Sequence, residues 1–335
     1  MRRGRLLFAL VGVAVFGVSL GAGATVGYDR ARWARGTDGG DAAAIVSRVD
    51  VRAGAPTPGA VTDAPSTAPA TSRAGAAGSP SPSPIGTPVA SWPLVAADSP
   101  GPPYGFALRV PVLMYHRVAP ADQVGRSLSS LVVPPDVFAA QLEALVAAGW
   151  RSITAADLAA DLADGVAPPP RTFVITFDDG RSDGYTEALP ILQRLDLVAT
   201  FYVITGRISN DSGSLSASQL RRMAAAGMEI GSHTVGHVRL TTTSLSSALD
   251  QLSGSAARIA AVTGQRPTTF AYPFGTTDPL RQDLVRQAGY AMAFTEADGC
   301  WMSWPTRLMA PRVRVTPSTT PEGLLRTLEV CTGGA

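Results

Sequence analysis

Two histidines four residues apart and two adjacent aspartates are the residues of this sequence best suited to chemistry. His233 and His237 enclose the segment HTVGH. In a helical turn, side chains four positions apart share one face, so both imidazoles can reach a single metal ion. Asp178 and Asp179 close the run ITFDDG. The simpler alternatives are two surface histidines on a loop, and a turn after a strand in which Gly180 supplies backbone freedom.

The two pairs together predict a metal-dependent hydrolytic site. Two histidines and one aspartate make a three-ligand site for zinc or another borderline divalent metal and leave positions open for water and substrate. The second aspartate can then act as a general base toward water. The positive charge of the metal also offsets the repulsion between the two carboxylates. The same ligands suit a mononuclear iron oxygenase, but that chemistry has no use for the second aspartate.

The elements that position these residues alternate between strands and helices, which predicts a parallel sheet and most simply a barrel. A capping box of Ser216 and Gln219 begins one helix, which Gly227 can end. Another helix ends at Gly264, with an apolar face of Leu245, Leu249, Leu252, Ala256, Ile259 and Val262. The predicted buried strands are RVPVLMYH (109–116), RTFVITF (171–177), LVATFYVI (197–204), GMEIGSH (227–233), TTFAYPF (268–274) and GYAMAFT (289–295).

Polar residues follow these strand runs. His116, the pair Asp178 and Asp179, His233 and Tyr272 all lie at or near the end of a run. In a parallel barrel the chemistry sits where strands end and loops begin. We therefore expect these residues to converge on one rim.

These motifs resemble those of the polysaccharide deacetylases, carbohydrate esterase family 4. The resemblance extends over most of residues 108 to 316 and includes PVLMYHRV, TFDDG, ATFYV, HTVGH, FAYPFG and APRVRV. It implies a distorted (β/α) barrel of about seven parallel strands, a metal that is usually Zn2+, and hydrolysis of N-acetyl or O-acetyl groups on sugars. It also implies that Asp178 is the catalytic base and that Asp179, His233 and His237 are the metal ligands.

Two departures point to one branch of that family. Many members carry an arginine that orients the base, and here Ala271 stands in its place, with Arg312 and Arg314 as candidate replacements. Many members also carry a late histidine as general acid, and this chain has no histidine after His237. The motifs of one branch of the family, the poly-N-acetylglucosamine de-N-acetylases, look circularly permuted in the same way, and this chain resembles that branch. That resemblance implies His116 as the general acid.

Several further side chains are candidates for contact with the substrate. Tyr272, Phe274 and Arg312 are candidates for substrate binding or for stabilising an oxyanion. Trp301 and Trp304, like Tyr272 and Phe274, are candidates for packing against sugar rings, and ordinary core or rim packing is the alternative for each.

The N-terminal third predicts an anchor and a tether. Residues 6–26 are 21 positions without a charge after a basic start, which is enough to cross a bilayer, and a cleaved signal is the alternative. A region rich in Ala, Pro, Ser and Thr follows and is expected to be disordered. We therefore expect an anchor segment at 1–35, a linker at 36–105 and a catalytic domain at 106–335. That domain would lie outside the cytoplasm, at the cell membrane or secreted.

Composition narrows the partners. The 28 basic residues are scattered and balanced by 26 acids, so no nucleic-acid surface is predicted. Cys300 and Cys331 can pair outside the cytoplasm or remain free thiols. We expect a monomer whose substrate is an acetylated polysaccharide of the cell envelope or the extracellular space. The alternatives are an O-acetyl esterase acting on a decorated glycan and a non-catalytic glycan-binding protein.

Overall fold

The computed structural model describes residues 93, 95–102, 104–120 and 130–334. The predicted membrane anchor at 6–26 and the predicted linker as far as residue 92 lie outside the described residues. Within the described ranges, no helix combines the length and the apolar character needed to cross a membrane.

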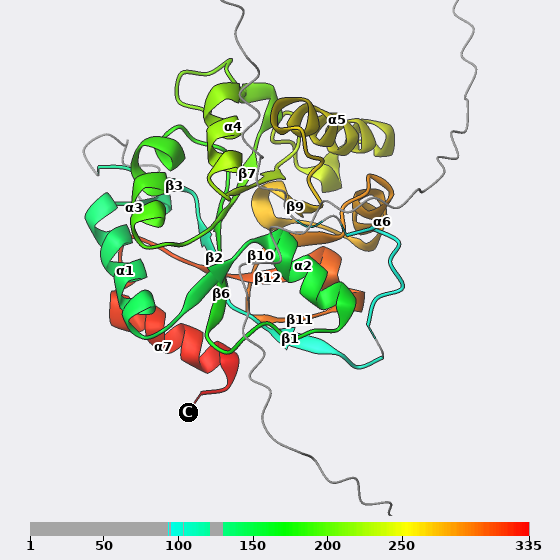
Figure 1. The fold of residues 1–335 in the computed structure, drawn as a ribbon. Coiled ribbons are helices and arrows are strands. Elements are labelled where there is room, and N and C mark those ends of the chain that lie inside the picture. The colour runs from blue at the N-terminus through cyan, green and yellow to red at the C-terminus, as the bar shows by residue number, and fades with distance from the viewer. Residues whose placement is uncertain (1–92, 94, 103, 121–129, 335) are drawn as a thin grey trace, which may run out of the picture. The chain divides into compact units, whose positions relative to one another are not determined.

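Seven parallel strands close into a barrel, as the resemblance implied (Figure 1). Around the barrel their order is β2, β12, β10, β9, β8, β7 and β6, and β6 pairs with β2 to close the ring. The barrel strands are β2 (Val112–Tyr115), β6 (Thr172–Phe177), β7 (Thr200–Val203), β8 (Glu229–Ser232), β9 (Thr269–Ala271), β10 (Met292–Asp298) and β12 (Ala310–Arg314).

An eighth strand, β5 (Arg151–Ile153), distorts the barrel. It pairs with the first half of β6, where Ile153 lies beside Val174. β7 pairs with the last residues of β6, where Phe201 lies beside Phe177. Since β2 occupies the other edge of β6 along the same residues, β5 and β7 share one edge of this strand.

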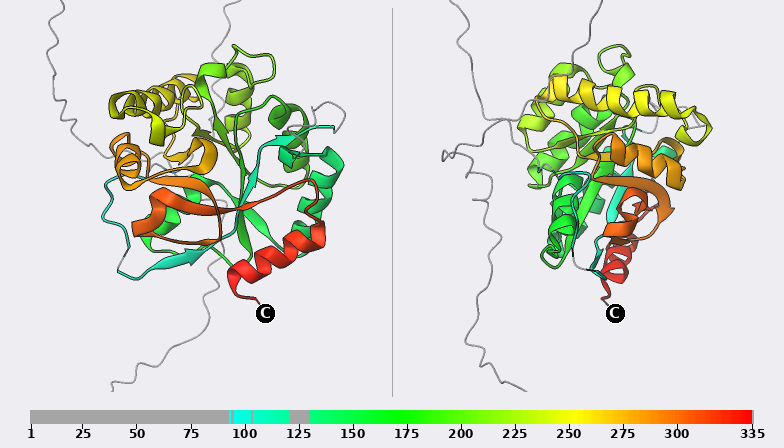
Figure 2. Two further views of the ribbon diagram at one scale, coloured as in Figure 1. Left: turned by 180° about the vertical axis from the view of Figure 1, so that it is seen from behind. Right: turned by 90° about the vertical axis from the view of Figure 1, so that its right-hand side faces the viewer.

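Helices surround the strands, and two small pairs of strands lie outside the barrel (Figure 2). The pairs are β1 (Ala107–Arg109) with β11 (Trp301–Ser303), and β3 (Arg117–Val118) with β4 (Val132–Val133). The helices are α1 (Pro135–Ala147), α2 (Ala155–Asp164), α3 (Leu189–Arg194), α4 (Ala217–Ala225), α5 (Leu245–Thr263), α6 (Pro279–Gln287) and α7 (Pro321–Thr332).

All six predicted strands are present, and the predicted helix ends are largely right. The capping box of Ser216 and Gln219 begins α4, and Gly264 ends α5 in the left-handed conformation. One residue of the predicted apolar face of α5 is wrong. Leu245 is exposed, while Ala248 one turn later is buried, because the first turn of α5 extends past the neighbouring core.

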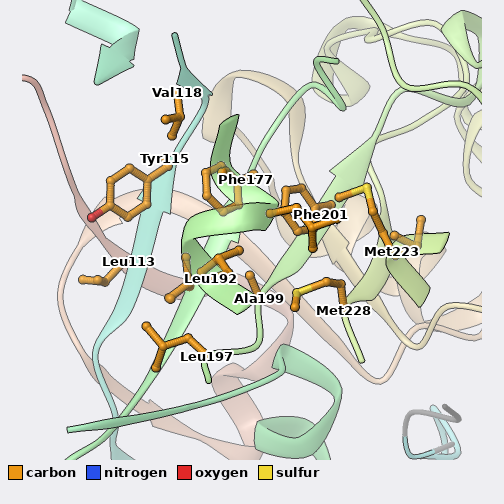
Figure 3. Packing of buried hydrophobic residues seen from close by; sticks show 14 of the residues in the cluster. Leu113, Tyr115, Val118, Phe177, Leu192, Leu197, Ala199, Phe201, Met223 and Met228 are labelled. Carbon is orange, nitrogen blue, oxygen red and sulfur yellow. The ribbon is translucent and has the colours of Figure 1, made fainter. Parts of the chain in front are cut away.

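The alternation of side chains along β6 divides the interior into two layers. Phe173, Ile175 and Phe177 point outward into the core beneath the helices, and Val174 packs inside the barrel. Figure 3 shows Phe177 between Tyr115 of β2 and Phe201 of β7. Its ring centroid lies 5.5 Å from that of Tyr115 and 4.7 Å from that of Phe201. Residues of even number in β6 therefore face the interior of the barrel.

The described residues before β1, all of which except Phe106 fall in the predicted linker at 36–105, pack against the barrel. Val95 and Phe106 pack on its interior cluster, and Ala97 is buried. Arg286 at the end of α6 pairs with Asp98. This segment crosses the end of the barrel at which the strands begin, because Pro93 accepts a hydrogen bond from Thr268, directly before β9. We refer to this end as the base and to the opposite end as the rim.

Helix α2 closes the base through a buried carboxyl group. Glu229, the first residue of β8, accepts hydrogen bonds from Ala156 N at 2.8 Å and from the hydroxyls of Thr200 and Thr269. Burial raises the pKa of Glu229 to about 7, although these three donors act in the opposite direction. The carboxyl group thus joins the first turn of α2 to three barrel strands.

Replacing this carboxyl group should change how stability depends on pH. A carboxyl group whose pKa rises from 4.5 to about 7 on folding destabilises the fold progressively as pH rises through that interval. The loss is on the order of 3 kcal/mol. We expect the difference in free energy of unfolding between wild type and Glu229→Gln, measured by urea denaturation, to shift by this amount between pH 4.5 and pH 7. If the free energy of unfolding changed with pH equally in the two proteins, the raised pKa of Glu229 would be contradicted.

Cys300 and Cys331 form a disulfide, with Cα atoms 5.7 Å apart, that ties the end of β10 to α7. The bond closes a loop with a sequence separation of 31 residues. A loop of that size predicts a stabilisation of about 3 to 4 kcal/mol through the unfolded chain.

The double substitution Cys300→Ala and Cys331→Ala should therefore lower the free energy of unfolding by about 3 to 4 kcal/mol. Urea denaturation with and without reductant measures the effect. Reductant should lower the stability of the wild type and leave the variant unchanged. Equal stability of the two proteins without reductant would show that the bond contributes nothing.

Candidate metal centre and active site

Asp179, His233 and His237 bring their ligand atoms together at the rim. One such atom from each residue lies within 4.8 Å of the other two. Asp179 Oδ1 is 3.3 Å from His237 Nε2 and 3.7 Å from His233 Nε2. One carboxylate oxygen and two imidazole nitrogens at these separations could hold a divalent metal ion.

The tautomer of His233 suits metal binding. His233 follows β8, is buried, and places Nδ1 2.7 Å from Ala271 O. A carbonyl oxygen only accepts, so a proton lies on Nδ1, and in the neutral ring Nε2 then has its lone pair available for a metal. Burial, together with the neighbouring His233, lowers the pKa of His237, which favours the neutral ring that ligation requires.

The predicted helical turn between the two histidines is wrong. The segment after β8 is an irregular loop in which Thr234 and His237 have left-handed φ values of 66° and 57°. The hydroxyl of Thr234 accepts a hydrogen bond from His237 N at 2.9 Å and stabilises the turn. Asp179 is also left-handed, with a φ of 73°. The three candidate ligands meet because two loops bend sharply, and not because of a helical period.

Asp178, the neighbour of the candidate ligand Asp179, is held by Arg312 inside the barrel. The guanidinium donates from Nη1 to Oδ1 at 2.9 Å and from Nη2 to Oδ2 at 2.7 Å. Both side chains are buried. Burial alone would raise the pKa of Asp178, but the charge and hydrogen bonds of Arg312 hold it well below its ordinary value. Asp178 is therefore ionised and has a fixed orientation.

Arg312 is thus not placed to touch substrate, which corrects one of its two predicted roles. It has no exposed surface, and Nε donates to Thr295 O at 2.9 Å. It instead orients the carboxylate of Asp178, the role for which Arg312 and Arg314 were both candidates. Arg314 pairs with Glu296 in a partly exposed position.

His116 follows β2 and faces the same part of the rim. Burial lowers the pKa of its imidazole, while the charges of Asp178 and Asp179 act to raise it. Its neighbour Tyr115 accepts a hydrogen bond at O from Asp178 N at 3.0 Å, so His116 and the aspartate pair leave adjacent strands side by side. The side chain of His116 is partly exposed.

The predicted aromatic candidates separate into one that reaches the site and three that do not. Phe274 is 45% exposed, and its ring centroid lies 4.7 Å from that of His237. Tyr272 is buried and donates to Leu308 O at 2.9 Å, so its predicted contact with substrate is wrong. Trp301 lies in β11 outside the barrel, and Trp304 packs on the core at the base.

The position of Arg312 could have been found in the sequence. In the run APRVRV, Ala310 and Arg312 alternate with more exposed positions, and Arg312 shares the inward face with the buried Ala310. Glu229 shares the inward face of β8 with His233 in the same way. A charged residue at an inward position of a barrel strand must find a partner there.

Comparison with known proteins places this geometry in context. The sequence model of the family described as polysaccharide deacetylase matches residues 165–293. YxkH of Bacillus subtilis (strain 168), a protein assigned to polysaccharide deacetylases, is 28% identical over 209 residues, which cover 62% of this chain and 72% of YxkH.

Two solved structures are similar to the described domain. The Streptococcus pyogenes deacetylase PplD in complex with acetate matches with a TM-score of 0.62 and 28% identity, over 66% of this chain and 98% of PplD. IcaB from Ammonifex degensii matches with a TM-score of 0.58 and 26% identity, over 67% of this chain and 97% of IcaB.

Removing Arg312 should destabilise the protein far more than removing its neighbour Arg314. Arg312→Met leaves the carboxylate of Asp178 buried and unpaired, which should cost about 3 to 5 kcal/mol of unfolding free energy. Arg314→Met, the matched control two residues along β12, breaks an exposed pair and should cost less than about 1 kcal/mol.

A double variant tests the pairing itself. Asp178→Asn combined with Arg312→Met should lower the free energy of unfolding by clearly less than the sum of the two single changes, because neither charge of the pair then remains buried. Equal costs for the two arginine variants in urea denaturation, or additivity in the cycle, would count against the pair.

Proposed function

We propose that this chain, which belongs to the polysaccharide deacetylases, is a metal-dependent hydrolase. It would remove N-acetyl groups from a glycan that contains N-acetylglucosamine. The products are acetate and a free amino sugar. The proposed substrate is a polysaccharide of the cell envelope or the extracellular space.

The observation that carries the proposal is the pairing of two carboxylates with different partners at one rim. Asp179 faces two histidine nitrogens, and Asp178 is held by Arg312. A site with one ligand carboxylate and one ionised, unligated carboxylate suits hydrolysis with a general base. The similarity to PplD, whose structure contains acetate, agrees with an acetyl substrate.

The donor set fits a divalent metal, with zinc as the proposed ion. Asp179, His233 and His237 would hold it. When bound, the metal would polarise the acetyl carbonyl and make nearby water more acidic.

Asp178 is the proposed general base. It is ionised at neutral pH, so it can accept a proton from the attacking water. Arg312 binds both of its oxygens and keeps the carboxylate in one orientation. A base that cannot rotate away loses little entropy on reaching the reactive arrangement.

The proposed acid and oxyanion donor lie on other strands. His116 would donate a proton to the departing sugar nitrogen, since an amine leaves poorly unless protonated. Within AYPFG, Tyr272 N and Gly275 N donate to backbone carbonyls, and Pro273 has no N–H. Ala271 belongs to strand β9, so we assign the N–H of Phe274, in the loop beside the histidines, as the donor to the developing oxyanion.

The proposed location is outside the cytoplasm, with the domain held to the membrane by residues 6–26 or released if that segment is cleaved. The disulfide between Cys300 and Cys331 agrees with an oxidising compartment. The proposed state is a monomer.

Two other functions would use the same domain differently. An O-acetyl esterase would act through the same residues but would depend less on a proton from His116, because an alkoxide leaves more readily than an unprotonated nitrogen, which would leave as an amide anion. A non-catalytic glycan-binding protein would need neither an ionised Asp178 nor a metal.

Acetate release from a panel of N-acetylated and O-acetylated glycans tests the proposal. The protein should release acetate when loaded with zinc and lose this activity after chelation. Asp178→Asn should still bind zinc, measured by calorimetry, but its kcat should fall at least about 100-fold. His116→Gln should lower kcat on the amide substrates much more than on the esters.

Other outcomes assign the function differently. Zinc binding without acetate release from any glycan would support the binding module. Efficient release from esters alone would support the esterase. Failure to bind any divalent metal would contradict the proposed chemistry.

A further inference from the structure

Most acidic side chains near the rim are already paired with arginine. Four carboxylates there lie within ion-pair distance of one arginine each. The pairs are Asp178 with Arg312, Asp183 with Arg117, Asp211 with Arg181, and Glu296 with Arg314. Two rim arginines, Arg207 after β7 and Arg239 after β8, form no ion pair with any described residue. Among the described residues, these two arginines therefore have no acidic side chain within ion-pair distance.

Arg239 is fixed in place although it lacks an acidic partner. Its guanidinium carbon lies 4.4 Å from the ring centroid of Phe274, in a cation–π contact. Nη1 donates to the hydroxyl of Thr276 at 3.0 Å. The Nη2 and Nε groups make no hydrogen bond to a described residue. A guanidinium held in this way has donors available for a ligand.

The fixed guanidinium lies one aromatic ring away from the metal centre. The ring of Phe274 is in contact with both Arg239 and the ligand His237. Phe274 has a left-handed φ of 61°, so the loop after β9 is bent to present this ring. Arg207 lies on the loop after β7, where its neighbour Gly206 donates from N to Val235 O, in the segment between the two histidines, at 2.9 Å. The two free arginines therefore lie on loops beside the same ligand.

We propose that Arg239, assisted by Arg207, binds a carboxylate carried by the sugar that is deacetylated or by its neighbour. The substrate class is thus an acidic N-acetylated glycan, and this inference rests on the proposed deacetylase function. Arginine binds a carboxylate through two parallel hydrogen bonds, which fixes orientation as well as adding affinity. A neutral glycan would leave both guanidinium groups without an anionic partner.

The test compares two substrates that differ only in charge. One is an N-acetylated oligosaccharide with a carboxylate on alternate sugars, and the other is the same oligosaccharide with those carboxylates amidated. The zinc-loaded full-length protein should deacetylate the acidic form with a kcat/KM roughly 10- to 100-fold higher. Arg239→Gln should lower kcat/KM for the acidic substrate much more than for the amidated one, mainly through a higher KM, and so remove most of this preference.

Matched variants separate binding from positioning. Arg239→Lys keeps the positive charge but cannot form the two parallel hydrogen bonds of a guanidinium group, so it should retain part of the preference for the acidic substrate. Arg326→Gln removes one positive charge from an exposed position on α7, remote from the histidines, and should leave kcat/KM for both substrates unchanged. Higher salt should reduce the ratio of kcat/KM for the acidic substrate to kcat/KM for the amidated substrate in the wild type.

Three results would overturn the inference. The wild type could deacetylate both forms equally, which would leave the deacetylase function intact and reject carboxylate recognition. Arg239→Gln could impair both substrates by the same factor, which would make Arg239 a positioning residue for Phe274. No turnover of either form, or of any other acetylated glycan, would reject the proposed function on which the inference rests.

Discussion

A carboxylate and a guanidinium meet inside the barrel, away from water, and neither is stable there without the other. Transfer of either charge into the interior costs several kcal/mol, so Asp178 and Arg312 are compatible with the fold only as a pair. The strand period puts both on the inward face, on β12 and at the end of β6. Because Arg312 occupies both oxygens of Asp178, this carboxylate is not free to rotate toward the histidines. The division of labour between the two adjacent aspartates follows from this pairing.

The site itself depends on backbone conformations that side-chain-bearing residues rarely adopt. Among the described residues, seven other than glycine have left-handed φ values, and four of these belong to the site: Asp179, Thr234, His237 and Phe274. Such conformations cost about 1 to 3 kcal/mol each and persist only where the surroundings enforce them. Here the enforcing contacts include the hydrogen bond from His237 N to Thr234 and the packing of Phe274 between Arg239 and His237.

Stability at the base balances this strain at the rim. Glu229 ties α2 to three strands, and the segment before β1 packs across the same end. In barrels of this kind, the loops at the carboxyl ends of strands carry the chemistry while the opposite end contributes stability. The chain enters the barrel at the base. The rim loops are therefore free to bend around a ligand without the constraint of the entering segment.

The sequence by itself determined the closed parallel barrel and the set of residues around the site. Strand runs ending in His116, Asp178 and His233 predict a shared rim, because parallel strands all present their carboxyl ends on one side. The sequence left open what orients Asp178, because Arg312 lies 134 residues away and only barrel closure brings the two together. It suggested a helical turn for His233 and His237, where the structure has a strained loop. It also made Tyr272 a candidate for substrate contact, although the hydroxyl is buried on Leu308 O. Local pattern determines which face a side chain takes, and tertiary structure alone decides which distant partner it meets there.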